Sequence, residues 1–245
     1  MSRSNPYQNT PSPAACRWEW KGGEGILQWY DKEAKENITE KLPMTFLMLD
    51  RTASVTGYSE PRESGMYSNE VKDTLTQPLI VKWQKKGLGT LAEGLWQDIK
   101  DKVKANSGKY AINCWVAFRD DGVLKIGVVK MSGCALGPWI EFEQEVGADL
   151  YKKAVVMTAG EQEGKAIKYH PPVFALKDAK PETDAEAKAL DAELQKYFES
   201  YFSRPTAART EAPAHEPEGE PSGEPGSAEP GEPGEPANEG DDVPF

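Results

Sequence analysis

Apolar and polar residues alternate with a period of two through much of residues 16–131, which is the pattern of half-buried β-strands. Residues 16–21 place Trp18 and Trp20 on one side of a strand and charged residues on the other. A run of glycines then turns the chain into a second apolar stretch over residues 26–30. These two stretches predict an N-terminal β-hairpin.

The longest predicted strand spans residues 42–58. Its first half, from Met44 to Leu49, is apolar on both faces, as expected of a central strand. Its second half alternates small polar residues with Ala, Val and Gly, so one of its faces is expected to be polar. Shorter runs over residues 66–75 and 78–84 predict the next two strands.

A helix is predicted over residues 88–103, because apolar residues recur there at spacings of three and four. These residues are Leu88, Leu91, Leu95, Ile99 and Val103. Two more strands, over 110–119 and 123–131, follow on either side of Asp120-Asp121-Gly122, a turn that is typical of hairpins. The order of elements is therefore β-β-β-α-β-β.

This order predicts an OB-fold barrel, a fold whose strand face and loops bind oligonucleotides. Beyond the barrel we expect a C-terminal β/α extension, with a hairpin over residues 150–158 and 165–176 and a helix over 177–204. The apolar stripe of that helix consists of Leu190, Leu194, Tyr197, Phe198, Tyr201 and Phe202. The stripe either caps the barrel or makes a dimer contact, and we expect the former because amphipathic helices usually face their own core. The chain is accordingly expected to be a monomer or a dimer.

The charge is distributed unevenly along the chain. From Glu211 onward there are eleven acidic residues and no Lys or Arg, which leaves 29 of the 40 acidic residues in 1–210 against 29 Lys and Arg. The first 210 residues are therefore formally neutral, and the net charge of -11 lies on the tail. Because the tail is rich in Pro, Gly and Glu and has few apolar residues to bury, we expect it to be disordered.

Three segments follow from these patterns. Residues 1–15 form a predicted disordered lead of Ser, Pro, Asn and other mostly polar residues. Residues 16–204 form the predicted OB-fold domain with its extensions, and 205–245 form the disordered acidic tail. The tail ends in Asp241-Asp242-Val243-Pro244-Phe245, where a compact apolar residue follows two acids and a proline.

This ending is either a recognition tip or the end of a solubilising tail. We expect a tip, since a solvating segment has no use for a bulky apolar residue at its end. A partner with an apolar pocket rimmed by Arg or Lys would bind Phe245 and the acids around it (Asp241, Asp242, Val243 and Pro244 complete the tip).

The tip resembles the acidic C-terminal tip of bacterial single-stranded DNA-binding proteins, which ends in acids, an aliphatic residue, Pro and Phe. The close match covers five residues and the composition of the tail; the body is unlike the bacterial protein, so a phage-type relative is the nearer comparison. The resemblance implies an OB-fold that coats single strands without strong sequence preference in DNA replication, recombination and repair. It also implies a tip that recruits partner proteins of those processes, in the cytoplasm of a bacterial host if the protein is phage-encoded.

Binding of a single strand requires aromatic faces for bases and cationic groups for phosphates. Trp115 lies on the side of its strand opposite the apolar residues, so it either stacks on bases or is covered by the C-terminal hairpin. Tyr58 and Tyr67 are the next stacking candidates. Trp83 alternates with core positions, and is predicted to be core. The candidate phosphate contacts on the barrel strands and their loops are Arg51, Arg62, Lys72, Lys82, Lys85, Lys86, Lys125 and Lys130.

Other classes of function find little support. No nucleotide-binding, serine-hydrolase or zinc-protease motif occurs, so we expect neither an enzyme nor a cofactor. Neither His170 nor the cysteines have metal-ligand spacing, and Cys16, Cys114 and Cys134 are predicted to be reduced thiols of a cytoplasmic protein. No run is long and apolar enough to span a membrane, and the first fifteen residues lack the apolar core of a secretion signal.

Two alternatives stay open at this stage. The protein could be a decoy that occupies partners' pockets with its tip and binds no nucleic acid, or it could coat RNA. If it coats DNA, the tethered tail is present at roughly millimolar effective concentration and competes with the strand for the cationic surface. Deletion of residues 211–245 is then expected to tighten binding at low salt and to lessen its salt dependence.

Overall fold

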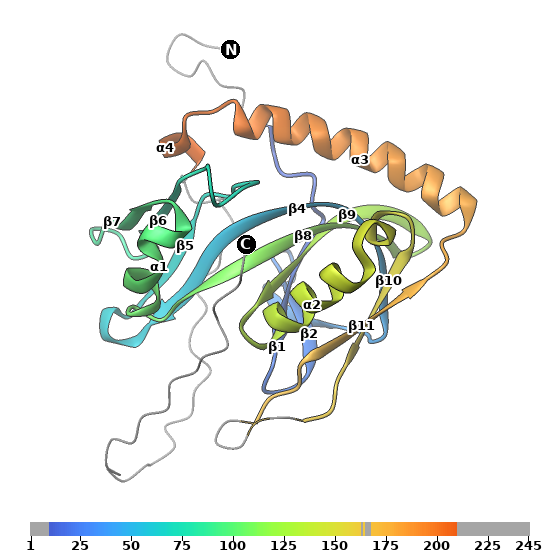
Figure 1. Cartoon of the computed structure of the whole chain (residues 1–245), viewed down its shortest axis with the longest axis horizontal. Helices are drawn as coiled ribbons and strands as arrows, with labels where there is room; N and C mark the ends of the chain where they lie inside the picture. The colour runs from blue at the N-terminus through green and yellow to red at the C-terminus, as the bar shows by residue number, and fades with distance from the viewer. Residues whose placement is uncertain (1–9, 163, 165–167, 210–245) are drawn as a thin grey trace.

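The computed structural model describes residues 10–162, 164 and 168–209. This part of the chain is mainly β, with eleven strands joined in one sheet that does not close on itself, and with helices on both sides of it (Figure 1). The predicted tail begins with the short helix α4 (Thr206–Arg209), where disorder was expected. Its acidic part and its tip, like most of the predicted lead, lie outside the described residues. No helix in the described part combines the length and the apolar character needed to cross a membrane.

In the described residues, strands alternate with helices after the seventh strand. The strands are β1 (Cys16–Lys21), β2 (Ile26–Asp31), β3 (Glu36–Glu40), β4 (Met44–Ser59), β5 (Ser64–Ser68), β6 (Leu79–Trp83), β7 (Thr90–Gly94), β8 (Gly108–Asp120), β9 (Val123–Ser132), β10 (Ala154–Ala159) and β11 (Pro172–Lys177). The helices are α1 (Trp96–Lys104), α2 (Leu136–Val146), α3 (Pro181–Phe202) and the short α4 (Thr206–Arg209). α1 precedes β8, α2 precedes β10, and α3 and α4 follow β11. Three 3-10 turns are η1 (Glu60–Arg62), η2 (Gly133–Ala135) and η3 (Gly147–Tyr151).

The centre of the sheet is a Greek key. Strands β4, β5 and β6 follow one another as antiparallel neighbours, and β8 returns after β7 and α1 to pair antiparallel with β4. The resulting order β8-β4-β5-β6 is the spatial order of a Greek key. Gly57 and Gly108 are register partners on β4 and β8, and a Cβ on Gly57 would lie 2.6 Å from the carbonyl oxygen of Ser107. Glycine is therefore needed where β4 passes the end of the α1–β8 connection.

The N-terminal hairpin is confirmed. β1 and β2 pair antiparallel, β3 adds a third strand, and β1 joins the Greek key by pairing parallel with β9. Trp18 and Trp20 share the buried face, as their alternation predicts. Since β9 pairs with β1 on this side, the sheet continues into the hairpin and stays open.

The predicted helix over 88–103 is wrong in its first half. Residues 90–94 form β7, which pairs with β6, and α1 begins only at Trp96. Gly87 and Gly89 have positive φ and turn the chain back along β6. The helix-like spacing of Leu88 and Leu91 therefore falls within a β-hairpin. Ile99 and Val103 are buried on α1 as expected. The sequence interpretation also missed β3 and α2, and extended β5 beyond Ser68, where it ends.

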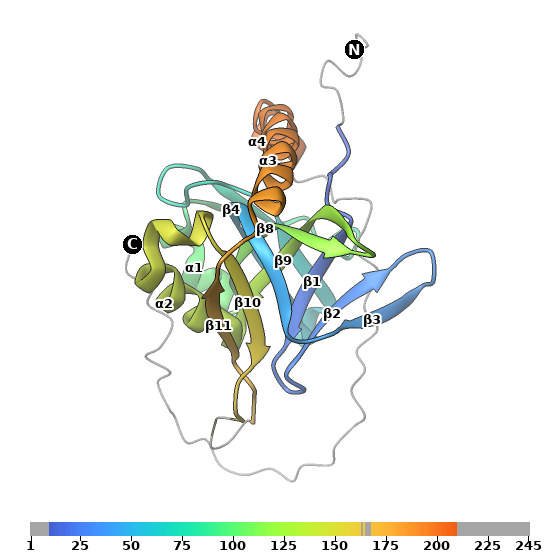
Figure 2. The same cartoon turned by 90° about the vertical axis from the view of Figure 1, so that its right-hand side faces the viewer.

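Helices and the C-terminal hairpin cover the sheet on both sides (Figure 2). On one side, α2 and the β10–β11 hairpin pack over a core that includes Phe46 and Trp139, while α1 packs over a second core that includes Val55 and Met66. On the other side, α3 crosses the sheet. The hairpin is confirmed, and β10 also pairs with the first half of β4.

The apolar stripe of α3 packs on the sheet. Leu194 and Phe198 are buried against Ile126 and Val128 of β9 and Trp115 of β8. The stripe thus serves the core of its own chain, as predicted.

Candidate nucleic-acid interface

A row of side chains crosses the Greek key on the side of the sheet that α3 covers elsewhere. Lys109, Thr56, Tyr67 and Lys82 are successive register partners on β8, β4, β5 and β6. Register partners project their side chains from the same face of a sheet. Lys109 is exposed and the other three are half-buried, so the row presents an aromatic ring between two ammonium groups.

Tyr58 adds a second ring to this row. It lies two residues beyond Thr56 on β4, and therefore on the same face, and it is 42% exposed. Its register partner on β5 is Gly65, which has no side chain to cover the ring. The amide end of the Gln84 side chain occupies the space that a Cβ on Gly65 would take.

Two loops bring more positive charge to the same end of the sheet. The side chain of Lys85 forms an ion pair with Glu63 at 3.4 Å, and its backbone N–H donates to the Ser64 hydroxyl at 3.1 Å. These contacts hold the β6–β7 turn against the β4–β5 loop, where Arg62 ends η1. Arg62, Lys85 and Lys86 are all exposed. We call the whole set the open face: Tyr58, Arg62, Tyr67, Lys82, Lys85, Lys86 and Lys109.

The open face has a rigid support. Met66 and Trp83 are register partners on β5 and β6 with their side chains on the opposite side of the sheet, in the core that α1 covers. Trp83 is thus a core residue, as predicted. Because this core fixes the two strands, the backbone positions of Tyr67 and Lys82 on their other side are fixed without a ligand.

Trp115 does not belong to this surface, which corrects the first stacking candidate. Its side chain is fully buried, and the rings of Phe198 and Tyr197 on α3 lie 5.2 and 5.6 Å from its centroid. The cover is the C-terminal helix, where the sequence suggested the C-terminal hairpin. A base cannot reach this ring while α3 is in place.

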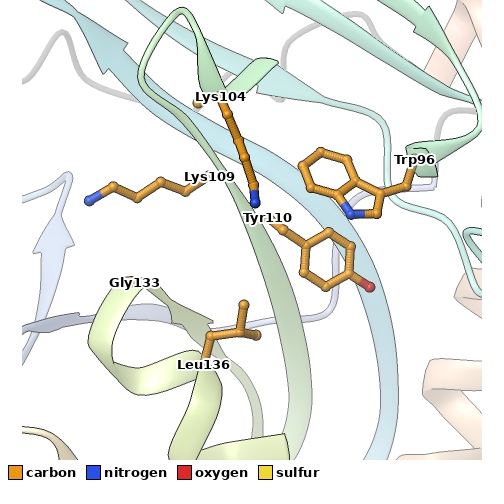
Figure 3. Close-up of a pocket in the computed structure, with 7 residues that line it drawn as sticks. Trp96, Lys104, Lys109, Tyr110, Gly133 and Leu136 are labelled. Atoms are coloured by element: carbon orange, nitrogen blue, oxygen red, sulfur yellow. The ribbon is translucent and has the colours of Figure 1, made fainter. Parts of the chain in front are cut away.

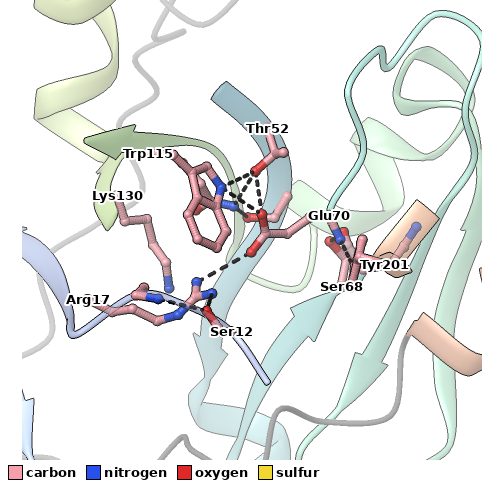
Figure 4. Close-up of polar contacts among 12 residues, drawn as sticks. Ser12, Arg17, Thr52, Ser68, Glu70, Trp115, Lys130 and Tyr201 are labelled. Carbon is pink, nitrogen blue, oxygen red and sulfur yellow. Dashed lines mark hydrogen bonds and ion pairs between the residues drawn. The ribbon is translucent and has the colours of Figure 1, made fainter. Parts of the chain in front are cut away.

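A buried polar network holds α3 and Trp115 together (Figure 4). The Glu70 carboxylate accepts hydrogen bonds from the Thr52 hydroxyl and from Trp115 Nε1, the latter at 3.3 Å. The same carboxylate pairs with Arg17 at 3.3 Å, and the backbone N–H of Glu70 donates to the Tyr201 hydroxyl at 2.9 Å. Burial raises the pKa of Tyr201, so this tyrosine remains neutral. The network ties the N-terminal strand, β4, β8 and α3 into one structural unit.

Two of the residues predicted to contact phosphates, Arg51 and Lys72, make ion pairs within the chain instead. Arg51 forms an ion pair with Glu143 of α2 at 2.6 Å, on the side of the sheet opposite the open face. Lys72 pairs with Asp50, and its ammonium lies 3.8 Å from the centroid of the Phe198 ring. Burial lowers the pKa of Lys72. Both cations stabilise helices and do not extend the open face.

Two more candidates lie away from the open face. Lys125 pairs with Asp120 at 2.8 Å at the β8–β9 turn, the end of β8 opposite Lys109. Lys130 pairs with Glu19 of β1 at 2.9 Å, and its ammonium lowers the pKa of Glu19 to about 2. The structure therefore brings together Tyr58, Tyr67, Arg62, Lys82, Lys85 and Lys86, but not Arg51, Lys72, Lys125, Lys130 or Trp115.

Lys109 is the residue of the open face that the sequence interpretation missed. The predicted strand began at Tyr110, which left Lys109 in the preceding turn. In the structure β8 begins at Gly108, and Lys109 pairs with Thr56. The alternation of Lys109 with Ala111 and Asn113 was the available signal.

Other chemistry is sparse in the described residues. The three cysteines are free thiols, and burial raises the pKa of each, most strongly for Cys114. Within the described ranges no group of three or more His, Cys, Asp or Glu is placed to hold a metal ion. The ring of His170 contacts the carbonyl oxygen of Gly160 at 3.1 Å and packs beneath Gly25. His170 thus has a place in the packing of the β10–β11 hairpin.

No protein-family model, curated protein or solved structure matches this chain. The residues of the tip, from Asp241 to Phe245, lie outside the described part of the chain, and what is inferred for them comes from the sequence.

Proposed function

We propose that this protein binds single-stranded DNA on the open face and coats it without strong sequence preference, in replication, recombination or repair of DNA. The observation that carries the proposal is the gathering of two tyrosine rings and two lysines on one end of one sheet face, with three more cations exposed on the loops at that end. Tyr58 and Tyr67 offer ring faces to bases, and the cations around them offer contacts to phosphates.

The chemistry of the open face suits binding that tolerates any base. Every base has a face that can stack on an aromatic ring, and each stacked base contributes roughly 1–3 kcal/mol in proteins that bind single strands. Lysine and arginine contact phosphates, which are the same at every nucleotide. A surface built of these two kinds of side chain binds with a strong dependence on salt and with little preference for sequence.

We further propose that the Greek key is an OB-fold. The order of the strands β4, β5 and β6, then α1, then β8 and β9 supports this, as does the Greek-key pairing itself. An OB-fold binds oligonucleotides on the face of its second and third strands and on the loop between its first and second. Here those strands are β5 and β6, which carry Tyr67 and Lys82, and that loop carries Arg62.

The acidic tail has a separate role in the proposal. The tip, Asp241-Asp242-Val243-Pro244-Phe245, would recruit replication, recombination or repair proteins that offer an apolar pocket with basic residues at its rim. The formal neutrality of residues 1–210 supports this division, since the acidic average of the chain comes from the tail alone.

The proposal is tested by titrating the full chain into 5′-labelled oligo-dT and following fluorescence anisotropy. Six of the seven tryptophans are buried, so intrinsic fluorescence would be a poor reporter. We expect saturable binding that weakens as salt is added, and that unlabelled single-stranded DNA displaces more readily than a duplex. The absence of binding in dilute buffer would overturn the proposal and favour a protein that acts through its tip. Preferential displacement by RNA would redirect it to an RNA-coating role.

The same assay tests the tail. Removing residues 211–245 is expected to tighten binding at low salt, because the tethered anion no longer competes for the cations of the open face. The difference between the two chains should shrink as salt is raised. Equal affinity and equal salt dependence would show that the tail does not compete, while leaving the binding of DNA in place.

A further inference from the structure

A pocket of about 110 Å³ opens beside the first residues of β8, between α1 and the start of α2 (Figure 3). It is lined by Trp96, Lys104, Gly108, Lys109, Tyr110, Gly133 and Leu136. Tyr110 is the register partner of Val55, so its ring projects to the side of the sheet opposite Tyr67. The pocket therefore lies around the edge of the sheet from the open face.

The lining of the pocket combines aromatic surface with positive charge. The rings of Trp96 and Tyr110 lie 5.1 Å apart and are tilted by 43°. Lys104 descends beside Tyr110 in Figure 3, and Leu136 bounds the far side. The described residues that line the pocket include two lysines and no carboxylate, and the acids whose charges act on Tyr110 from nearby are Glu143 and Asp73. An anion with a flat apolar part suits such a lining.

Lys109 connects this pocket to the open face. It is the last residue of the row that runs through Thr56, Tyr67 and Lys82, and it also lines the pocket. The pairing of β8 with β9 begins only at Ala111, so among the described residues no strand pairs with the β9 side of β8 at Lys109. A single strand that follows the row from β6 to β8 can therefore pass this edge and reach the pocket.

We propose that the pocket holds one nucleotide of the bound single strand, with its base against Tyr110 and Leu136 and its phosphate on Lys104 and Lys109. This inference rests on the proposed function and extends it by a specific site. The row on the open face binds the first nucleotides, and the pocket binds a nucleotide further along the strand. Short oligonucleotides occupy the open face alone, and longer ones reach Lys104.

The test compares Lys104→Ala with Lys102→Ala in the full chain, using oligo-dT of graded length across the roughly 4–16 nucleotides that one OB-fold covers. Both lysines lie exposed on α1, but only Lys104 lines the pocket. For each length, the slope of log K against log salt is measured. One lost phosphate contact reduces this slope by about 0.7 for single strands. We expect that reduction for Lys104→Ala with the longer oligonucleotides only, and no reduction for Lys102→Ala.

The possible failures separate cleanly. If both variants keep the slope of the unmodified protein at every length, the pocket does not hold the strand, although the open face does. If Lys104→Ala reduces the salt slope equally at every length, Lys104 contacts the first nucleotides bound. The proposed course of the strand from the open face to the pocket is then wrong. If the unmodified protein binds oligo-dT of no length, the proposed function itself has failed.

Discussion

The two ends of one sheet face differ in what covers them. At one end, Trp115 projects from β8 and is sealed by α3, whose Phe198 lies against its ring. At the other end, Tyr58 projects from β4 on the same face, opposite a glycine, and is 42% exposed. Both residues are aromatic side chains on the polar side of a strand, yet one belongs to a core and the other to the surface.

The difference lies in a segment far along the chain. α3 carries an apolar stripe that packs on the Trp115 end of the face, and the Tyr201 hydroxyl near the end of α3 accepts a hydrogen bond from the Glu70 backbone. An aromatic residue on a polar face therefore indicates a binding platform only where no other segment supplies a matching cover.

Substitutions at the covered end are expected to lower the stability of the fold. Phe198→Ala removes a buried ring that packs on Trp115, and we expect the free energy of unfolding to fall by about 3–5 kcal/mol because a cavity remains. Urea denaturation followed by circular dichroism measures this. Glu199→Ala, an exposed neighbour on the same helix, is the control and should change stability by less than about 0.5 kcal/mol. A loss below about 1 kcal/mol for Phe198→Ala would mean that α3 does not seal the sheet.

Substitutions at the open end are expected to weaken the binding of oligo-dT. Tyr58→Ala is expected to weaken oligo-dT binding by roughly 1–3 kcal/mol, since one stacked base loses its platform, while the fold remains intact. Trp115→Phe is the matched variant at the covered end. It removes the Nε1 donor to Thr52 and Glu70 and should lower stability by about 1–3 kcal/mol. Its affinity for oligo-dT should be unchanged; a loss of affinity there would place DNA on the covered end.

Charge should separate the two ends in the same way. Lys82→Ala removes a phosphate contact from the open face and is expected to reduce the slope of log K against log salt by about 0.7. Lys72→Ala, at the covered end, removes the partner of Asp50 and the cation over Phe198. It should leave the salt slope unchanged. An equal change of slope in both variants would contradict the assignment of DNA binding to the open end alone.

A smaller effect concerns the ion pair of Glu19 with Lys130. Lys130 holds the pKa of Glu19 at about 2, below its ordinary value of 4.5. A lowered pKa in the folded protein means that this pair stabilises the fold above about pH 4.5 and ceases to do so as the pH falls toward 2. Glu19→Gln should therefore be less stable than the unmodified chain near neutral pH, and the gap in unfolding midpoint should close toward pH 2. A gap that does not vary with pH would contradict this.

Local patterns predicted much of the fold. The hairpin with Trp18 and Trp20, the long strand β4 and the β8–β9 hairpin across Asp120-Asp121-Gly122 follow from alternation and turn residues that lie within a few positions of each other. The leucines before Trp96 were misleading because their spacing fits a helix as well as the β6–β7 hairpin. The signal for α2, which the sequence interpretation missed, is the spacing of three between Leu136, Trp139 and Phe142.

The candidate site was predicted only where it depends on features local in the sequence, which are the alternation within strands and the loops between them. Tyr58, Tyr67 and Lys82 were identified from their own strands, and register then placed them together. Trp115 could not be assigned in the same way, because its cover on α3 lies some eighty residues further along the chain. Arg51 likewise finds its partner on α2, and only the fold brings the two together. The pattern of residues along a single sequence does not reveal contacts between distant segments.

Photo-crosslinking tests the central claim most directly. Oligo-dT carrying a photoreactive thymine analogue is bound to the full chain, irradiated, and the adducts are assigned by mass spectrometry. The account predicts adducts on Tyr58 and Tyr67 of the open face and none on Trp115. Adducts on Trp115, or saturated binding that leaves both tyrosines unmodified, would contradict it.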